Sequence, residues 1–238
     1  MKAFLLAAGL GTRLKPLTDR VPKCLVPVCG RPLLAYWLDL LTAHEVQQVL
    51  VNTFHLAQQV DAFVAASEHR DRIEVLPEPR LLGSGGTLLR HRASLEGAPF
   101  LVAHADNLTH FDVGAFVRAH EQRPQGAEMT MLTFETDQPS ACGILELDAH
   151  GIVTAFHEKV ANPPGRLANA AVYIMQPSVL QFLARLGKEE IDLSTEVLPR
   201  YLGRIFTHPL RGYLRDIGSP SALAAAEAEF ADYLGHVA

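Results

Sequence analysis

The first half of the chain alternates short apolar runs with amphipathic stretches. The apolar runs predict strands at residues 3–7, 48–52, 73–76 and 100–103. Apolar side chains at helical spacing predict helices at residues 32–41, 56–64, 85–92 and 113–123. Strands that alternate with helices in this way predict a mostly parallel sheet with helices on both faces.

The pattern changes after about residue 127, where strands follow one another with fewer helices between them. Strands are predicted at residues 128–134, 144–147, 152–157 and 172–175, and helices at residues 176–186, 195–202 and 222–234. No Gly-, Ser- or Pro-rich linker and no repeat separates the two halves. The sequence therefore predicts one compact α/β unit with an extended second half.

Composition agrees with a folded chain and locates its positive charge. The chain has 238 residues, 48% of them hydrophobic and 20% charged, with a formal net charge of −5. Six Lys and Arg residues nevertheless lie in residues 1–31 against one acid, Asp19. The acidic total argues against nucleic acid as a partner, and no apolar stretch is long enough to predict a membrane span. The local cluster instead indicates a small anionic ligand.

A glycine turn precedes this positive cluster. Gly9 and Gly11 follow the first predicted strand, and Arg13, Lys15 and Lys23 come after them. Backbone N–H groups in such a turn can bind phosphate oxygens, and the cations add charge. A dinucleotide fingerprint would require glycine where Leu14 stands, which disfavours a dehydrogenase, and the chain holds no Walker A motif. The sequence therefore predicts a phosphate loop of another kind.

The run LAAGLGTRLKPLTDRVPKCLVPV resembles the signature of the sugar-1-phosphate nucleotidyltransferases, with Cys24 where many relatives have proline. The resemblance implies a Rossmann-like three-layer α/β/α domain with a mostly parallel mixed central sheet. It implies a single domain over residues 1–238, in which residues 1–126 bind the NTP and residues 127–238 bind the sugar phosphate. Relatives are often dimers, so a homodimer is compatible with it.

The resemblance also assigns residues to the nucleotide. The segment EPRLLGSGGTLL (78–89) resembles the second nucleotide segment of the family, in which glycines keep the backbone open beside the base and Thr87 starts a helix. Together the two motifs imply nucleotide contacts from Leu6, Ala8, Gly9, Gly11, Thr12, Arg13, Lys23, Glu78, Gly83 and Thr87.

Further motifs resemble the metal and sugar sites of the family. FLVAHADNL and YLRDIGSPSAL imply that Asp106 and Asp216 bind Mg²⁺, although Ala105 replaces the usual glycine. Arg13, Lys23 and Asp106 are the implied catalytic residues. The segment 142–175 resembles the sugar-binding half, with Asn169 just before a strand at residues 170–175. The implied contacts with the sugar phosphate are Asn107, Gly143, Glu158, Lys159 and Asn169.

The implied reaction joins a nucleoside triphosphate to a sugar 1-phosphate and releases pyrophosphate. The motifs look most like GTP-using enzymes for mannose or heptose 1-phosphate, with UTP- or dTTP-using enzymes as alternatives. A CTP:phosphocholine-type cytidylyltransferase and a non-catalytic nucleotide-sugar sensor are the further alternatives. The first disagrees with Glu158, Lys159 and Asn169, and the second with the presence of all the charged residues above.

The remaining reactive residue types predict no additional site. The eleven histidines show no metal-binding spacing, so we interpret them as surface or core residues. Cys24, Cys29 and Cys142 lack disulfide or metal spacing, and the start of the chain does not resemble a signal peptide. These features favour a reducing, cytoplasmic environment. Trp37 and the leucines around it are expected in the core.

Overall fold

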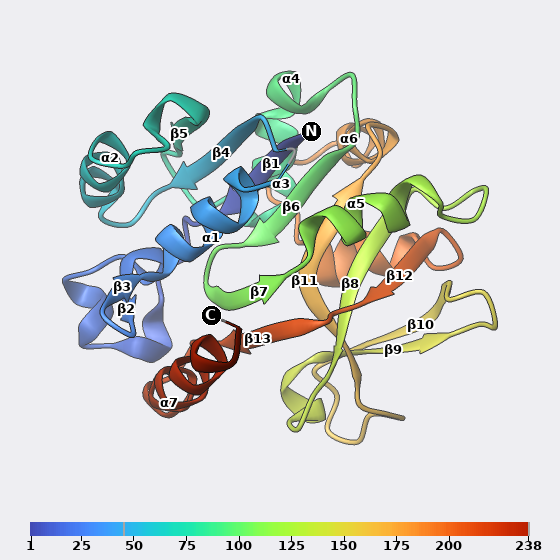
Figure 1. Ribbon diagram of the computed structural model, residues 1–238. Coiled ribbons are helices and arrows are strands. Elements are labelled where there is room, and N and C mark those ends of the chain that lie inside the picture. The colour runs from blue at the N-terminus through green and yellow to red at the C-terminus, as the bar shows by residue number, and fades with distance from the viewer. Residues whose placement is uncertain (45, 238) are drawn as a thin grey trace. The chain divides into compact units, whose positions relative to one another are not determined.

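A computed structural model describes residues 1–44 and 46–237 as a mixed α/β chain (Figure 1). The chain forms two compact units. The N-terminal unit comprises Lys2–Leu81, Ala103–Val113 and Arg211–Ala238, and the central unit comprises Met1, Leu82–Val102 and Gly114–Leu210. These units are built from interleaved segments, so their borders differ from a division at residue 126. That division concerned which half binds which substrate, and it stays a prediction.

Three parallel strands form the sheet of the N-terminal unit. Strand β4 pairs with β1 and with β5, and all three were predicted to within two residues (Figure 1). Two predicted helices connect them, each with apolar side chains buried along one face. The bounds are β1 Lys2–Leu6, β4 Gln48–Thr53, β5 Ile73–Pro77, α1 Leu33–Thr42 and α2 Ala57–Ala65. Because parallel strands end at the same edge, the segments after β1 and β4 are neighbours.

The sequence pattern missed several short elements of this unit. Strands β7 (Asn107–Phe111) and β13 (Gly212–Asp216) pair antiparallel, with Asp216 opposite Asn107. Short 3₁₀ turns and a small hairpin follow the phosphate loop: η1 Thr12–Leu14, η2 Leu17–Asp19, η3 Lys23–Leu25, β2 Pro27–Val28 and β3 Arg31–Pro32. A further turn, η4, covers Arg70–Arg72. The β7–β13 pair matters most, because it brings residue 216 next to residue 107.

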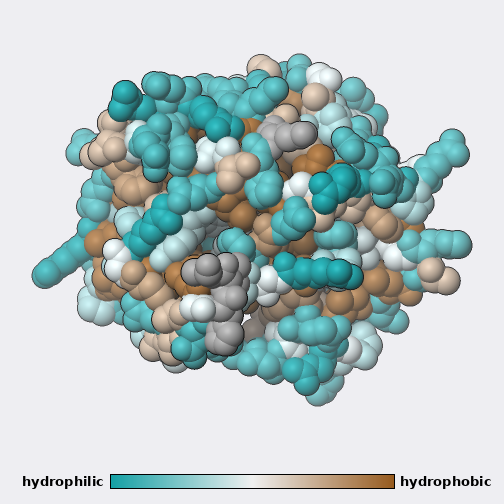
Figure 2. All heavy atoms as spheres, in the orientation of Figure 1, coloured by the Kyte–Doolittle hydropathy of each residue, from teal (hydrophilic) through white to brown (hydrophobic). Residues whose placement is uncertain are grey.

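The last helix, α7 (Pro220–Val237), begins two residues before its predicted start. Its inner face carries Ala226 and Phe230, which pack with Leu14, Val26 and Ile217 into an apolar cluster. Among the described residues, no helix is long and apolar enough to cross a membrane. On the face drawn in Figure 2, hydrophobic residues are interspersed with hydrophilic ones.

The central unit holds a mixed set of strands. Strand β8 pairs antiparallel with β11 and parallel with β12, and β9 pairs antiparallel with both β10 and β11. The bounds are β8 Met129–Glu135, β9 Gly143–Leu147, β10 Val153–Glu158, β11 Leu167–Met175 and β12 Ile205–Pro209. Strand β6 (Phe100–His104) contributes residues to each unit. Because β11 starts earlier than expected, Asn169 lies inside it, next to an irregularity in its pairing with β8.

The helices of the central unit differ from the predictions at their ends. The segment 195–202 is not one α-helix, because a π-helical turn gives way to a 3₁₀ turn that contains Pro199. Helix α3 starts at Gly83, four residues before Thr87, which was expected to start it. The bounds are α3 Gly83–Arg90, α4 Arg92–Leu95, α5 Val113–Glu121, η5 Pro139–Ala141, α6 Ser178–Arg185, η6 Leu193–Val197 and η7 Leu198–Arg200.

The glycines at the start of α3 are required by close backbone packing. The N–H groups of Gly85 and Gly86 both donate to the Ile191 carbonyl oxygen, at 2.9 and 3.1 Å. A Cβ atom on Gly86 would lie 2.1 Å from the Glu189 carbonyl oxygen, and one on Gly83 would lie 2.5 Å from that of Ile191. Only glycine allows this approach without a shift of the backbone.

Gly86→Ala should therefore destabilise the protein by about 3 kcal/mol, because the backbone around residue 189 must move to admit the methyl group. Gly165→Ala is the matched control, since no atom lies within 4 Å of a Cβ there. We expect the control to change the free energy of unfolding by less than about 0.5 kcal/mol. Urea denaturation measures both, and equal stabilities would show that the segment 189–191 moves away at little cost.

Candidate active site

The phosphate loop begins at the carboxyl end of β1. Gly11 has φ +61°, and a Cβ atom there would lie 2.8 Å from Cγ2 of Thr18, so this turn needs glycine. The turn leads directly into η1, which carries Thr12 and Arg13. By contrast, a Cβ on Gly9 would meet no atom within 4 Å. The conformation of the loop therefore requires glycine at position 11, whereas there is room for a side chain at position 9.

Lys23 joins the two predicted metal ligands. Its Nζ lies 2.7 Å from Oδ2 of Asp106 and 3.2 Å from Oδ1 of Asp216. The Lys23 side chain is 7% exposed, whereas those of the two aspartates are 38% and 50% exposed. The ammonium group is thus held inside the unit with both carboxylates on its outer side. Residues that lie far apart in the sequence form one electrostatic cluster.

The ammonium group changes the acidity of Asp106. Burial by itself raises the pKa of this carboxyl group, but the charge of Lys23, that of His104 and the hydrogen bond from Lys23 outweigh it. The pKa of Asp106 therefore lies below its ordinary value, and the group is a carboxylate at neutral pH.

Arg13 completes the cluster on the solvent side. Its guanidinium group lies 3.5 Å from Oδ2 of Asp216, and both side chains are at least half exposed. A Cβ on Gly218 would lie 2.5 Å from Nη2 of Arg13, so glycine at position 218 leaves room for the guanidinium group. An exposed pair at this distance contributes little to stability, so Arg13 is free to exchange its partner for an anionic ligand.

Two buried polar groups support the loops around the cluster. The indole N–H of Trp37, which is 1% exposed, donates to the Asn107 carbonyl oxygen at 2.8 Å. Asn52, at the end of β4, accepts a hydrogen bond from the N–H of Ala7 at 2.8 Å and donates to Glu78 at 3.0 Å. Trp37 is in the core as predicted, but its link to the residue after Asp106 was not foreseen. Asn52 fixes the first residue of the phosphate loop.

The central unit brings together part of the predicted sugar site. Oε2 of Glu158 would lie 2.7 Å from a Cβ on Gly143, so the two residues are direct neighbours across β9 and β10. Nζ of Lys159 lies 3.4 Å from Oε1 of Glu158, and Lys159 has φ +50°. Asn169 donates to the hydroxyl group of Tyr173 at 2.7 Å and accepts from the N–H of Ala171.

Thr87, a predicted nucleotide contact, also lies in the central unit, where it is buried in α3.

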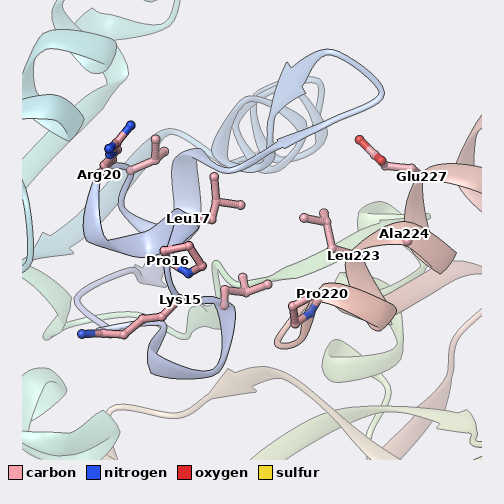
Figure 3. A pocket seen from close by; sticks show the side chains of 10 residues that line it. Lys15, Pro16, Leu17, Arg20, Pro220, Leu223, Ala224 and Glu227 are labelled. Carbon is pink, nitrogen blue, oxygen red and sulfur yellow. The ribbon is translucent and has the colours of Figure 1, made fainter.

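A pocket adjoins the phosphate-loop side of the N-terminal unit. It has a volume of about 710 Å³ and lies between the segment after η1 and the first turns of α7 (Figure 3). Lys15, Pro16 and Leu17 lie on one wall, and Pro220 and Leu223 on the other (Figure 3). Its lining is mainly apolar and does not include Lys23 or either aspartate. The cluster of Lys23 with the two aspartates and this pocket are therefore separate features, whereas Lys15 lines the pocket.

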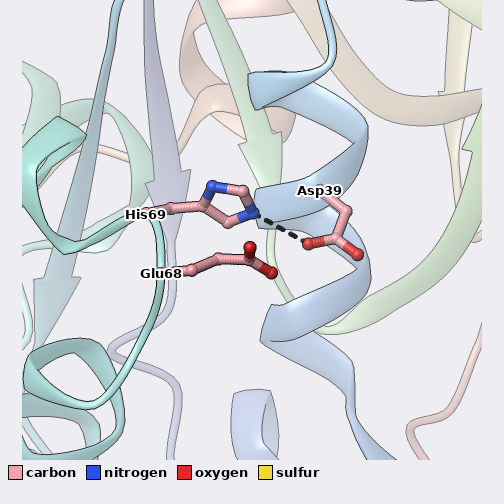
Figure 4. Close-up of side chains that lie close together, drawn as sticks. All are labelled: Asp39, Glu68 and His69. Carbon is pink, nitrogen blue, oxygen red and sulfur yellow. Dashed lines mark hydrogen bonds and ion pairs between the residues drawn. The ribbon is translucent and has the colours of Figure 1, made fainter.

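A second acidic group lies elsewhere in this unit. Ligand atoms of Asp39, Glu68 and His69 lie within 4.8 Å of one another, and Nε2 of His69 lies 3.0 Å from Oδ1 of Asp39 (Figure 4). Arg31 contacts the other oxygen of Asp39. Burial raises the pKa of Asp39, but the bonds from Arg31 and His69 outweigh this and lower it. We interpret the group as a link between α1 and the segment after α2.

The expected effect of removing the Lys23 charge depends on pH. A lowered pKa means that Asp106 stabilises the folded state above the unfolded pKa of about 4, and that this contribution is lost as the pH falls through the folded value. Lys23→Met should raise the pKa of Asp106 and destabilise the protein most near neutral pH. The difference in the free energy of unfolding between Lys23→Met and the wild type should become smaller below about pH 4.

Urea denaturation in metal-free buffer at pH 7 and pH 3.5 tests this expectation. Lys15→Met is the matched control, because its pair with Asp19 is exposed on both sides. A Lys23→Met deficit of the same size at both pH values would contradict the assigned coupling between Lys23 and Asp106.

Comparison with known proteins adds the family. The family model described as nucleotidyl transferase matches residues 2–232. The mannose-1-phosphate guanylyltransferase catalytic subunit beta of Xenopus tropicalis is 31% identical over 227 residues, which cover 92% of this chain. The chain spans 62% of the length of that relative. A UTP–glucose-1-phosphate uridylyltransferase of Synechocystis is 29% identical over 216 residues, covering 84% of this chain and 55% of the relative.

Among solved structures, HddC from Yersinia pseudotuberculosis complexed with GMP-PN superimposes with a TM-score of 0.79 at 24% identity. The match covers 96% of this chain and 99% of the other. It confirms the predicted mixed α/β fold class. The family match extends over nearly the whole chain and includes both the phosphate loop and the segments that carry the two aspartates. This chain therefore belongs to the nucleotidyl transferase family.

Proposed function

We propose that this protein transfers a nucleotidyl group from a nucleoside triphosphate to a sugar 1-phosphate, giving a nucleotide sugar and pyrophosphate. The observation that carries the proposal is the Lys23 ammonium group, which forms ion pairs with both Asp106 and Asp216 beside the phosphate loop. Both substrates are anions, so charge repulsion is the main obstacle to their reaction. A preorganised cluster of cations and carboxylates at a loop of this shape is suited to overcome it.

The charged side chains divide the work between the two substrates. Arg13, exposed at the end of the loop, binds the β- and γ-phosphates and the leaving pyrophosphate. Lys23 stabilises the charge that grows on the α-phosphoryl oxygens during attack. Lys159 binds the phosphate group of the sugar, whose oxygen attacks the α-phosphorus. That oxygen is already ionised near neutral pH, so positioning and electrostatics suffice without a general base.

The two aspartates fit a divalent cation. Their side chains are partly exposed and both contact the Lys23 ammonium group, so their oxygens face one point, and Mg²⁺ prefers carboxylate oxygens as ligands. Asp106 and Asp216 would hold the ion, which would supply charge neutralisation to phosphate oxygens. Lys23 then serves as the counter-charge of both carboxylates whenever the ion is absent.

GTP and mannose or heptose 1-phosphate are the proposed substrates. The guanylyltransferase relative, at 31% identity, supports this choice. UTP stays the second candidate because the uridylyltransferase relative matches almost as well.

Substrate identity is tested by pyrophosphate release from each of four NTPs with a panel of sugar 1-phosphates and phosphocholine. We expect GTP with mannose or heptose 1-phosphate to give the highest kcat/KM. Release with UTP or dTTP alone would contradict the choice of base while leaving the reaction class intact. No release with any pair, from a folded protein in Mg²⁺, would contradict the reaction class and favour a nucleotide-sugar sensor.

Lys23→Ala should lower kcat by roughly 10²–10³-fold and change the KM for NTP much less, because the α-phosphoryl charge grows only toward the transition state. Arg13→Ala should instead raise the KM for NTP as well, since Arg13 contacts phosphates that are charged in the ground state. Steady-state kinetics of both variants measure this difference. Near-normal turnover of Lys23→Ala at saturating substrate would contradict the role of Lys23.

Asp106→Asn and Asp216→Asn should each nearly abolish turnover, and the double variant should be little worse than either single variant. The reason is that both residues act through one cation, so losing either ligand already loses the ion. Activity should also disappear in excess chelator and return with Mg²⁺. Losses that multiply in the double variant, or full activity in chelator, would contradict a shared ion.

A further inference from the structure

The carbonyl oxygen of Gly11 is the fixed point of the phosphate loop. It accepts hydrogen bonds from the N–H of Leu14 at 2.9 Å and from the hydroxyl group of Thr18 at 2.8 Å. Thr18 is 1% exposed, and its methyl carbon lies against Gly11. The side chain of Thr18 therefore holds the turn from which Thr12 and Arg13 follow.

Thr18 is itself held by a residue of another segment. Nε2 of His55, just beyond the end of β4, lies 2.8 Å from the Thr18 carbonyl oxygen. A carbonyl oxygen only accepts, so Nε2 carries the proton. The next residue, Leu56, has φ +53°, an uncommon conformation for a leucine. Leu56 thus forms the turn between His55 and the first residue of α2.

We propose that His55 is a positioning residue for the phosphate loop. In the part of the chain that the structure describes, no hydrogen bond joins His55 to Arg13 or Gly11, and His55 acts through Thr18 on the Gly11 carbonyl oxygen. Two hydrogen bonds thus connect the segment after β4 to the loop that presents Arg13. The inference rests on the proposed binding of NTP phosphates at this loop.

The function of this connection follows from the loop that it reaches, which carries Arg13. Arg13 is exposed, and among the described residues its guanidinium group is held by one long contact, of 3.5 Å, with Asp216. Its direction therefore depends on the backbone from which it projects. If the turn at Gly11 loosens, the loop N–H groups and Arg13 lose their common alignment, and NTP phosphates bind less well.

The main experiment compares His55→Phe, which keeps a ring without the donor, with His55→Gln, which retains an N–H donor. We expect His55→Phe to raise the KM for NTP about tenfold, the effect of losing one neutral hydrogen bond, with kcat within about threefold of the wild type. His55→Gln should recover most of the affinity. Binding of a non-hydrolysable NTP by calorimetry should follow the same order.

Gln59→Ala is the matched control. Gln59 also donates to a backbone carbonyl oxygen of this region, that of Arg20 at 2.8 Å, but no hydrogen bond links that oxygen to Gly11 in the described residues. We expect its KM to stay within about twofold of the wild type. An equal rise of KM in Gln59→Ala would show that any loosening of the segment has the same effect, which would contradict the specific role of His55.

A double variant separates positioning from general stability. If His55 acts through Arg13, then His55→Phe added to Arg13→Ala should raise KM little beyond Arg13→Ala alone. Effects that multiply would contradict the coupling. Thr18→Val, which deletes only the hydroxyl group that reaches Gly11, tests the other end of the connection and should show the same KM pattern even if His55→Phe folds poorly.

Failure of this inference is distinct from failure of the proposed function. A wild-type protein that neither binds NTP nor releases pyrophosphate would contradict the proposed function. An active wild type with an unchanged KM in both His55→Phe and Thr18→Val would overturn only the positioning role.

Discussion

The Lys23 ammonium group between Asp106 and Asp216 is the interaction on which the arrangement of this site depends. It is nearly buried, and it joins the segment after the phosphate loop, which carries Lys23, to the segment after β6, which carries Asp106, and to the last residue of β13, Asp216. The pairing of β13 with β7, which sets Asp216 opposite Asn107, is what allows both carboxylates to reach one cation. The same charge holds the pKa of Asp106 below its ordinary value, so this group is a carboxylate, the state in which it can bind a metal ion.

Sequence periodicity predicted the regular elements because their buried faces are continuous. Strands β1, β4 and β5 and helix α1 were found to within two residues, since apolar side chains cover them at the expected spacing. Strands β7 and β13 were missed because they are short and each is hydrogen-bonded to the other, a pairing that the sequence of either strand does not show. The start of α3 was misplaced because its glycines, poor helix formers in isolation, are held by a distant carbonyl oxygen.

In the candidate site, too, some residues could be predicted from the sequence and others could not. The long signature at the phosphate loop predicted Arg13 and Lys23, and two shorter motifs predicted Asp106 and Asp216. The structure brings these four side chains together. The residues that support them, Asn52, Thr18, His55 and Trp37, were missed. Asn52 could have been suspected as a polar residue that ends an apolar strand. Nothing in the spacing of His55 or Thr18 shows which carbonyl oxygen each side chain reaches, because that depends on how β1 and β4 lie beside each other.

The packing of α3 against residues 189–191 limits how this chain can change over time. Gly83 and Gly86 face the carbonyl oxygens of Ile191 and Glu189, and Gly85 faces the Ile191 side chain, so a Cβ atom at any of the three would be closer than 3 Å to that segment. A lineage that acquires a side chain at position 86 loses stability unless the neighbouring segment shifts or lengthens as well. We therefore expect the two stretches, about a hundred residues apart, to change together, so that grafting either one alone from a related protein would produce a mismatch.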